Sequence, residues 1–377
     1  MSTKWTLKYS SAAVITAIII ILIALVANPP MLQTPTYTNT NFVIMLTDPP
    51  DVPAGTTTLS LTYSDIKIHI TYPNKTAEWL VANVSGNINL LSLINMTQTL
   101  TNITIPTSST IDKIQFTMTD IEAVINEITH NVTALSNTLT IEIANGYVNQ
   151  TLSGVLIDFT PILVEIESTD DYGALINYYV LVPSATAVII EDIVESQLKA
   201  GTILKLKESH KTQLANAEEE FKKNVNIIST SLAVNDDTTT LTVTLKNEGT
   251  NDFRIVGATL HGEFKTTQTQ KKQSDRQEQP SIRIHPRTIP FKPEDTSLVP
   301  LPGITPKQEN EHETPNYPEV TLEPEETISL TFADVIILQP KNKNTGQTTI
   351  ITPIVDNDYR LKLMGQGFQT IDIIATP

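Results

Sequence analysis

Cysteine is the first absence in this chain of 377 residues, which contains none. Disulfides, thiolate catalysis and cysteine-ligated metal sites are therefore excluded. Secreted eukaryotic domains of this size usually carry disulfides, so the absence favours a prokaryotic protein whose stability depends on packing and on hydrogen bonds within sheets.

Basic residues are the second scarcity, and they are unevenly distributed. Residues 28–198 contain three lysines and no arginine against seventeen acids, a balance of −14, whereas residues 199–377 contain twenty basic residues against twenty-four acids, a balance of −4. A strongly acidic segment repels a phosphate backbone, so we expect no nucleic-acid partner. The acidity is typical of a solvated exposed surface, and binding of cations or of a basic partner is the alternative.

Catalytic motifs are also missing. The sequence has no nucleophile elbow and no phosphate-binding glycine loop. Its histidines are scattered without the helical or loop spacing of zinc ligands, at positions 69, 130, 210, 261, 285 and 312. We therefore predict no enzyme, no catalytic residue and no cofactor.

Acidic pairs in three predicted loops contain the oxygen ligands that calcium prefers. They are Asp48 with Asp51, Asp170 with Asp171, and Asp356 with Asp358. Short acidic turns are common without a metal, so no metal site is predicted from them alone.

One long apolar run is present, Ala12–Ala27, with sixteen uncharged residues. If the helix extends back to Thr6 it is about 33 Å long, enough to cross a hydrocarbon core of about 30 Å. Trp5 and Tyr9 then lie at the headgroup level, where aromatic rings are common. Leu25 stands where a signal-peptide cleavage site needs a small residue. These features favour a retained transmembrane anchor at 12–27, with secretion after signal cleavage as the alternative.

The charges that flank this run predict its orientation. Lys4 and Lys8 precede it and no acid does, so residues 1–11 are expected in the cytoplasm and the bulk of the chain outside the cell. Prolines at 29 and 30 end the helix, and the Thr- and Pro-rich residues 28–40 are typical of a short extended stalk linker.

Residues 41–167 show the pattern of short strands separated by turns, which predicts a β-sandwich. In the strand from Leu59 to Tyr72 the apolar parity changes at Ser64-Asp65, which predicts a β-bulge. The sequence Asn145-Gly146 after the strand Leu139–Ile143 predicts a type I′ hairpin.

Residues 168–224 are predicted to connect two domains through a strand and an amphipathic helix. The helix is indicated by apolar positions at spacings of three and four, namely 203, 206, 210, 214, 217 and 221. Strand patterns return from 225 to 377 and predict a second, immunoglobulin-like β-sandwich. Residues 265–317 are polar and rich in proline, which predicts a long solvated or disordered insertion. The expected fold class is mainly β: an N-terminal transmembrane helix followed by two β-sandwich domains.

N-glycosylation sequons are concentrated in one window. Eleven asparagines between residues 74 and 151 give six Asn-X-Ser/Thr motifs, and the asparagines elsewhere give none. The candidate glycosylation sites are Asn74, Asn83, Asn95, Asn102, Asn131 and Asn149. The alternative is that Asn and Thr simply populate turns and exposed strand faces.

Four features of the first domain are considered together: Phe42–Pro50, the strand from Leu59 to Tyr72, Trp79, and Ile88–Leu93. In these features residues 41–167 resemble the family called domain of unknown function 4382. That family is known mainly from prokaryotic, often archaeal, secreted or surface-anchored proteins, so the resemblance implies a location at the cell surface. It implies no catalytic residues.

The sequence thus predicts a non-enzymatic, membrane-anchored extracellular surface glycoprotein with an envelope-structural or adhesive role. Its expected partners are the lipid bilayer, through the N-terminal helix, and other envelope proteins, surface glycans or copies of itself. One alternative is a pilin-like or strand-donating filament subunit. A second is an extracellular carbohydrate-binding module or hydrolase, because loops of a sandwich can host either.

Overall fold

The computed structural model describes residues 38–143, 146–148, 152–169, 175–234, 239–269, 281–291, 320–333, 348–365 and 367–377. The predicted anchor at 12–27, the stalk up to residue 37, Asn149 and the Asp170-Asp171 pair lie outside these residues. Contacts group Asn39–Pro377 into one compact unit. Within the described ranges no helix has the length and apolar character needed to cross a bilayer.

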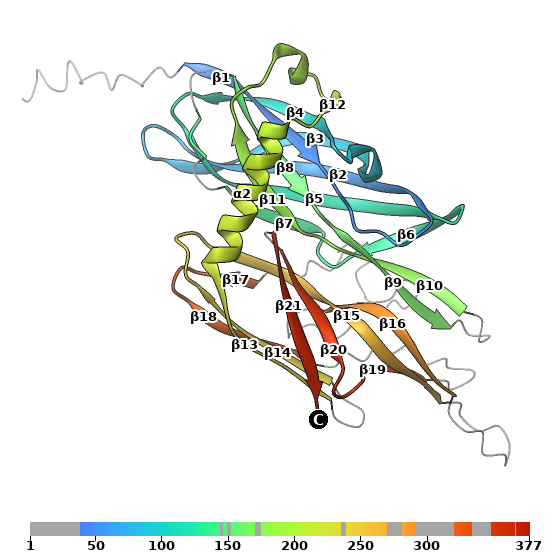
Figure 1. Cartoon of the computed structure of the whole chain (residues 1–377). Helices are drawn as coiled ribbons and strands as arrows, with labels where there is room; N and C mark the ends of the chain where they lie inside the picture. Colours follow the sequence, from blue (N-terminus) through green and yellow to red (C-terminus); the bar gives the residue numbers. More distant parts are fainter. Residues whose placement is uncertain are drawn as a thin grey trace, which may run out of the picture. The chain divides into compact units, whose positions relative to one another are not determined.

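The prediction of a mainly β protein is confirmed, because the described residues are dominated by strands in three sheets (Figure 1). A five-stranded sheet contains, in spatial order, β11 (Ala185–Ile190), β8 (Ser153–Phe159), β1 (Asn39–Thr47), β4 (Met96–Pro106) and β12 (Ile203–Lys205). β1 and β8 run parallel, with Thr47 paired in register with Asp158.

A seven-stranded sheet faces the first sheet. Its order is β3 (Ala77–Asn89), β2 (Thr56–Thr71), β5 (Thr110–Ile125), β6 (Ile128–Ala134), β10 (Leu175–Val182) and β9 (Ile162–Thr169), and β7 (Thr138–Glu142) pairs with β5. Alternating apolar residues from both sheets form one core, including Phe42 and Ile44 from β1 and Leu61 and Phe116 from β2 and β5. Strands β10 and β11 belong to these sheets although they lie in the segment predicted to connect two domains. The domain boundaries themselves stay a prediction.

The β-bulge predicted in the strand from Leu59 to Tyr72 is confirmed. The register of β2 with β3 shifts between Ser64 and Ile66, where Ser64 pairs with Ser85 and Ile66 with Ala82. Asp65 lies there at a φ of 50°. Against β5, two residues of β2, Asp65 and Ile66, oppose Phe116 alone, because Ser64 pairs with Thr117 and Lys67 with Gln115. The extra residue changes the inward parity of β2 as the sequence indicated.

The hairpin predicted at Asn145-Gly146 is wrong. The strand before it, β7, pairs with β5, whereas the strand after it, β8, pairs with β1 and β11 in the other sheet. Gly146 serves a different purpose, because a Cβ at this position would lie 1.5 Å from the carbonyl oxygen of Ile111. The glycine permits close backbone approach at a crossing between sheets.

A nine-stranded sheet is built from the C-terminal residues. Its order is β16 (Ser281–Phe291), β15 (Phe253–Thr269), β20 (Asp358–Gly365), β21 (Gly367–Thr376), β13 (Val225–Val234), β14 (Thr239–Asn247) and β18 (Thr327–Ala333), and β17 (Val320–Leu322) and β19 (Thr348–Pro353) pair with β15. Leucines of β14 and aromatic and aliphatic residues of β15 and β20 share a second core. Part of the predicted insertion is therefore strand: β15 runs to Thr269 and pairs with β16, and residues 270–280 and 292–319 lie outside the described ranges.

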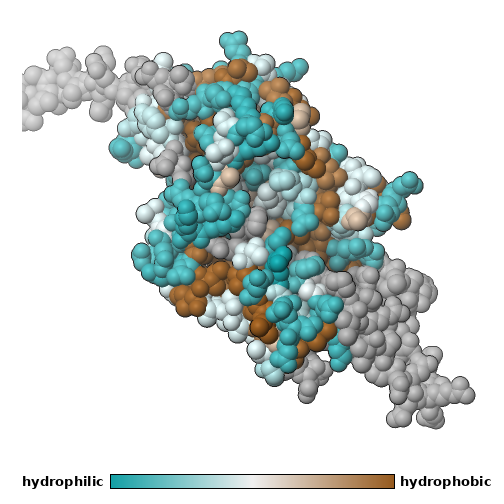
Figure 2. All heavy atoms as spheres, viewed as in Figure 1, coloured by the Kyte–Doolittle hydropathy of each residue, from teal (hydrophilic) through white to brown (hydrophobic). Residues whose placement is uncertain are grey.

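Helix α2 (Glu208–Asn224) packs on β11, and its apolar stripe contributes Leu214 to a cluster with Val43, Met45 and Leu156. The predicted amphipathic helix is thus present, but it begins at Glu208, later than the apolar spacing suggested. Ile203 belongs instead to β12 and is exposed. Figure 2 shows hydrophilic side chains over the outer face of the helix.

Candidate functional site

Three carboxyl groups, which we call the acidic cluster, act on one another in sequence: the charge of Asp158 acts on Asp48, and the charge of Glu218 acts on Asp158. Asp48 follows the last residue of β1, and Asp158 is the β8 residue paired with Thr47. In β8 the residues Val155, Ile157 and Phe159 face the main core, so the alternation of the strand directs Asp158 to the opposite, helix-covered face. Glu218 comes from α2.

Asp48 is the most unusual member of the acidic cluster. It is fully buried, and neither carboxyl oxygen has a hydrogen-bond partner within the described part of the chain. Two prolines follow it, so the next two residues offer no backbone N–H. Burial, reinforced by the charge of Asp158, raises the pKa of Asp48 well above its usual value. Burial therefore favours the neutral, protonated form of this carboxyl group over the ionised form.

Asp158 is perturbed in the same direction. Burial, followed by the charge of Glu218, raises the pKa of Asp158 from 3.8 to about 7. Glu218 also pairs with Lys222 on the same helix, with an Oε1 to Nζ distance of 2.8 Å. Lys222 thus pairs with one acid of the cluster, whereas ionisation of the other two, Asp48 and Asp158, is opposed by their burial.

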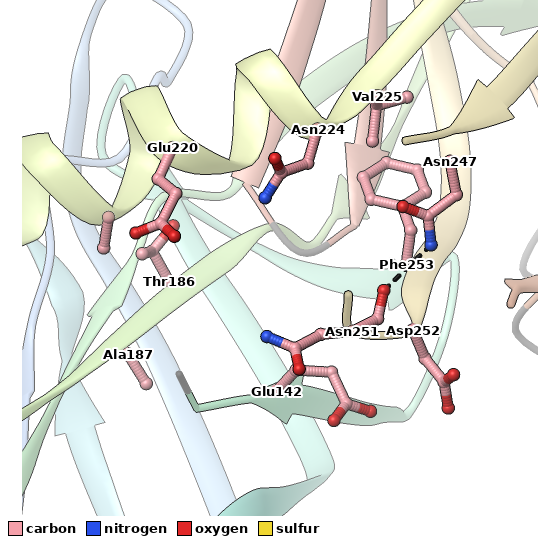
Figure 3. A pocket seen from close by; sticks show the side chains of 11 residues that line it. Glu142, Thr186, Ala187, Glu220, Asn224, Val225, Asn247, Asn251, Asp252 and Phe253 are labelled. Carbon is pink, nitrogen blue, oxygen red and sulfur yellow. Dashed lines mark hydrogen bonds between the residues drawn. The ribbon is translucent and has the colours of Figure 1, made fainter. Parts of the chain in front are cut away.

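A small pocket adjoins the acidic cluster through Thr186 of β11, the residue paired in register with Asp158. Figure 3 shows this junction pocket, with Glu220 and Asn224 of α2 on one side and Glu142 of β7 on the other. Its volume is about 70 Å³. Ligand pockets for small molecules usually measure about 300–1,000 Å³, so this space fits a few water molecules and not a sugar ring.

Ion pairs beside the junction pocket connect the seven-stranded sheet to the nine-stranded sheet. Lys113 of β5 lies 3.2 Å from the Glu142 carboxylate and 3.4 Å from that of Asp252. Arg254 of β15 lies 3.2 Å from Glu142, whose side chain is only 7% exposed. Lys362 and Asp51 form a further pair between the sheets at 3.7 Å. These partly buried ion pairs therefore connect the seven-stranded sheet to the nine-stranded sheet.

Asn247, the last residue of β14, lines the junction pocket and organises the turn that follows. Asn247 is buried, and its amide nitrogen donates to the carbonyl oxygens of Asn251 at 2.8 Å and Leu322 at 3.0 Å. Its side-chain oxygen accepts a bond from the N–H of Gly249. Asn247 therefore holds the turn from Asn247 to Asn251 against β17.

A second, wider pocket lies at the start of α2, with a volume of about 460 Å³. His210 Nε2 and Lys207 Nζ each lie 2.6 Å from a different carboxylate oxygen of Asp192. These bonds, chiefly the one from Lys207, lower the pKa of Asp192 to about 2. Ser209 also lines the pocket, but adjacent helix residues point in different directions, so the set does not have the geometry of a nucleophile and its base.

An exposed aromatic surface lies on the outward face of the seven-stranded sheet. Trp79 of β3 is 42% exposed and its ring centroid is 5.1 Å from that of His69 on β2. His69 Nδ1 lies 2.6 Å from Asp112 Oδ1. Val81, two residues along β3, is also exposed, so apolar surface follows the edge strand.

The described sequon asparagines share one property: all five are exposed, namely Asn74, Asn83, Asn95, Asn102 and Asn131. Their side chains are not equivalent. Asn74 uses its oxygen to accept bonds from Thr76 of its own sequon, at 2.9 Å from the N–H and 2.6 Å from the hydroxyl. Asn102 uses its nitrogen, which donates to the carbonyl oxygen of Leu198 at 2.5 Å. Asn149 lies outside the described residues.

The described acids considered as calcium ligands are Asp48, Asp51, Asp356 and Asp358. Asp48 is buried whereas Asp51 is exposed and pairs with Lys362. Asp356 and Asp358 are both exposed. A search of the described ranges finds no group of three histidine or acidic side chains able to hold a metal ion.

Sequence reasoning missed Asp158 and its relation to Asp48. One signal was available, because Asp158 interrupts an apolar strand, Val155–Phe159, on the face away from the main core. That this face lies under α2, beside Asp48, is a property of the tertiary fold.

No protein-family model matches this sequence, and no curated protein matches it. Among solved structures, the crystal structure of a β-glucosidase from Listeria innocua in complex with isofagomine has 9% sequence identity and a TM-score of 0.15 over 41% of this chain. The match covers 16% of that protein. A likeness this low carries no argument about fold or activity.

Proposed function

We propose that the chain is a non-enzymatic, membrane-anchored extracellular surface glycoprotein with a structural or adhesive role in the cell envelope. The observation that carries the proposal is that every described sequon asparagine is exposed. An attached glycan is bulky and must remain in solvent, so a buried asparagine in this set would have counted against it.

The arrangement of the sheets supports the proposal that the chain forms two β-sandwich domains. The five- and seven-stranded sheets share one core, as expected for a β-sandwich resembling domain of unknown function 4382. Strands β13, β14, β15, β20 and β21 of the nine-stranded sheet share a second core, as expected for an immunoglobulin-like module. Ion pairs between the two parts suit a protein that carries load rather than one that opens and closes.

The location at the membrane is supported by the sequence pattern alone. Ala12–Ala27 has the apolarity of an anchor and reaches its length when the helix extends back to Thr6, and Lys4 and Lys8 favour a cytoplasmic location for residues 1–11. We propose that residues after the stalk face outward, where glycans are attached.

The test of glycosylation is the intact mass of protein purified from native membranes, before and after chemical deglycosylation. We expect a loss of mass, and peptide mapping should place it within residues 74–151. An unchanged mass would remove the glycoprotein assignment.

The test of topology is protease treatment of intact cells together with N-terminal sequencing. We expect loss of the mass of residues 39–377 from the membrane fraction and an N-terminus at Met1 or Ser2. An N-terminus near residue 28 would instead indicate a cleaved signal, and cleavage within residues 1–11 would favour a processed filament subunit.

A further inference from the structure

The strand β3 forms one edge of the seven-stranded sheet and carries the exposed Trp79. It has thirteen residues and pairs on one side with β2, and no other described strand pairs with its second side. A long edge strand with exposed apolar side chains is a template for pairing with another chain, and proteins usually protect such edges.

The alternation of β3 places several side chains on one outward face. Ala82 and Ile88 point into the core and are buried. Trp79, Val81 and Asn83 have the opposite parity and are exposed. The sequon Asn83-Val84-Ser85 therefore lies on the same face of the same strand as the exposed tryptophan.

The position of Asn83 within the bulge adds a second argument. Asn83 and Val84 are the two β3 residues that oppose Asp65 between the pairs Ser64–Ser85 and Ile66–Ala82. A bulge leaves one residue out of the regular ladder and re-aims its side chain. Asn83 is thus exposed at the point of the edge where the ladder is interrupted.

The distances along the strand match the reach of an attached oligosaccharide. At about 3.3 Å per residue, Val81 lies roughly 7 Å and Trp79 roughly 13 Å from Asn83. Sugar rings present one apolar face of C–H groups, which suits an indole, and polar hydroxyl groups, which suit the neighbouring His69 and Asp112. A second sequon, Asn74, lies in the turn that precedes β3, so the two sequons bracket Trp79.

We propose that the N-glycan on Asn83 lies along the outward face of β3 over Val81 and Trp79, and that this cover prevents β3 from pairing with the same edge of a second copy. The proposal rests on the proposed function, since it requires the chain to be glycosylated. The occupant of the apolar surface is then part of the molecule itself.

Trp79 provides a direct readout, because the chain contains two tryptophans and the other is Trp5. Replacing Trp5 with Phe in the full chain leaves Trp79 as the single indole fluorophore. In that background, two variants remove the sequon differently: Asn83→Gln removes the attachment atom, and Ser85→Ala keeps Asn83 but removes the acceptor motif. Asn131→Gln, on β6, is the matched control.

Each variant is produced in the natural host and measured by intact mass, by acrylamide quenching of fluorescence and by sedimentation. We expect Asn83→Gln and Ser85→Ala to lose the mass of one glycan, to show a red-shifted emission and a larger quenching constant, and to form dimers. Adding Val81→Lys to Asn83→Gln should restore the monomer, because a lysine on an edge opposes pairing. Asn131→Gln should lose one glycan without changing the fluorescence.

The outcomes separate this inference from the proposed function. If no sequon carries mass, the glycoprotein assignment fails together with the inference. If Asn83 is unoccupied while other sequons are occupied, or if its glycan is lost without any change in quenching, the inference alone is overturned. A change in quenching without dimers would overturn the protective role and leave the contact with Trp79 standing.

Discussion

Replacing Asp158 with asparagine should stabilise the protein at neutral and alkaline pH and have little effect at pH 4.5. The pKa of Asp158 is raised from 3.8 to about 7 by burial and by Glu218. The folded state therefore keeps the proton over a pH range in which the unfolded state has lost it. As the pH rises from about 4 to 7, the unfolded state binds fewer protons, so the free energy of unfolding falls. Above about pH 7 the full cost of the ionised group is present.

The magnitude follows from the pKa difference. At 1.36 kcal/mol per pKa unit, the change from 3.8 to about 7 corresponds to roughly 4 kcal/mol of lost stability. Asp158 keeps some exposure, and water and Lys222 near Glu218 reduce this cost, so we expect a gain of about 2 kcal/mol for Asp158→Asn at pH 8. Asparagine has the shape of a protonated aspartic acid, so packing under α2 should be preserved.

The assay is urea unfolding of the full chain at several pH values between 4.5 and 8, compared for Asp158→Asn and the unsubstituted protein. Asp192 does not contribute to the change in unfolding free energy between pH 4.5 and 8. Its pKa is lowered to about 2, so its stabilisation is lost only as the pH falls from about 3.8 to 2. Asp120→Asn, at an exposed position of β5, is the matched control for the loss of one acidic side chain. A difference for Asp158→Asn that stays constant from pH 4.5 to 8 would refute the reasoning.

Three further predictions concern the junction and the sequons. Glu142→Gln leaves two partly buried cations without their shared carboxylate and should cost about 2 kcal/mol in urea unfolding, whereas Arg360→Gln, in an exposed pair, should cost about 0.5 kcal/mol or less. Asn247→Ala removes the side-chain partner of the buried carbonyl oxygen of Leu322 and of two partly buried groups, the carbonyl of Asn251 and the N–H of Gly249, and should cost about 2 kcal/mol in the same assay; a loss below about 0.5 kcal/mol would contradict this expectation. If the sequons are used, peptide mapping should find lower occupancy at Asn102 than at the other exposed sites, because its nitrogen already donates to Leu198; full occupancy there would show that this bond yields to the glycan.

Local patterns in the sequence predicted local features of the fold. The parity change at Ser64-Asp65 identified the bulge of β2 because burial of one strand face is read directly from alternation. The apolar stripe predicted α2 but extended too far toward its N-terminus, since Ile203 continues the helical spacing while its backbone pairs with β4. Spacing alone does not distinguish these cases, because edge pairing is a tertiary contact.

The failed hairpin at Asn145-Gly146 has a comparable cause. The dipeptide favours a tight turn between adjacent strands only when those strands belong to the same sheet. Here the chain leaves the seven-stranded sheet after β7 and enters the other sheet as β8, and Gly146 is required by its contact with the carbonyl of Ile111. A glycine in such a position can indicate either a tight hairpin turn or a close backbone contact, and a single sequence does not distinguish the two.

The acidic cluster lies further still from what a sequence can predict, since Asp48 and Asp158 are 110 residues apart and are brought together by a parallel strand pairing. β1 and β8 are brought side by side with Thr47 opposite Asp158, and α2 then covers that face. Each step is a long-range contact, and neither aspartate belongs to a motif. Burial and a neighbouring acid raise the pKa of both aspartates, so the native form is favoured by protons that the unfolded chain releases above about pH 4. Acidic conditions should therefore tighten the contact between α2 and the five-stranded sheet, and amide exchange along α2, measured at pH 5 and pH 8 and corrected for the intrinsic rate, should show greater protection at pH 5. Equal protection at both values would mean that Asp158 is ionised beneath the helix at no cost, which would contradict the argument from its burial.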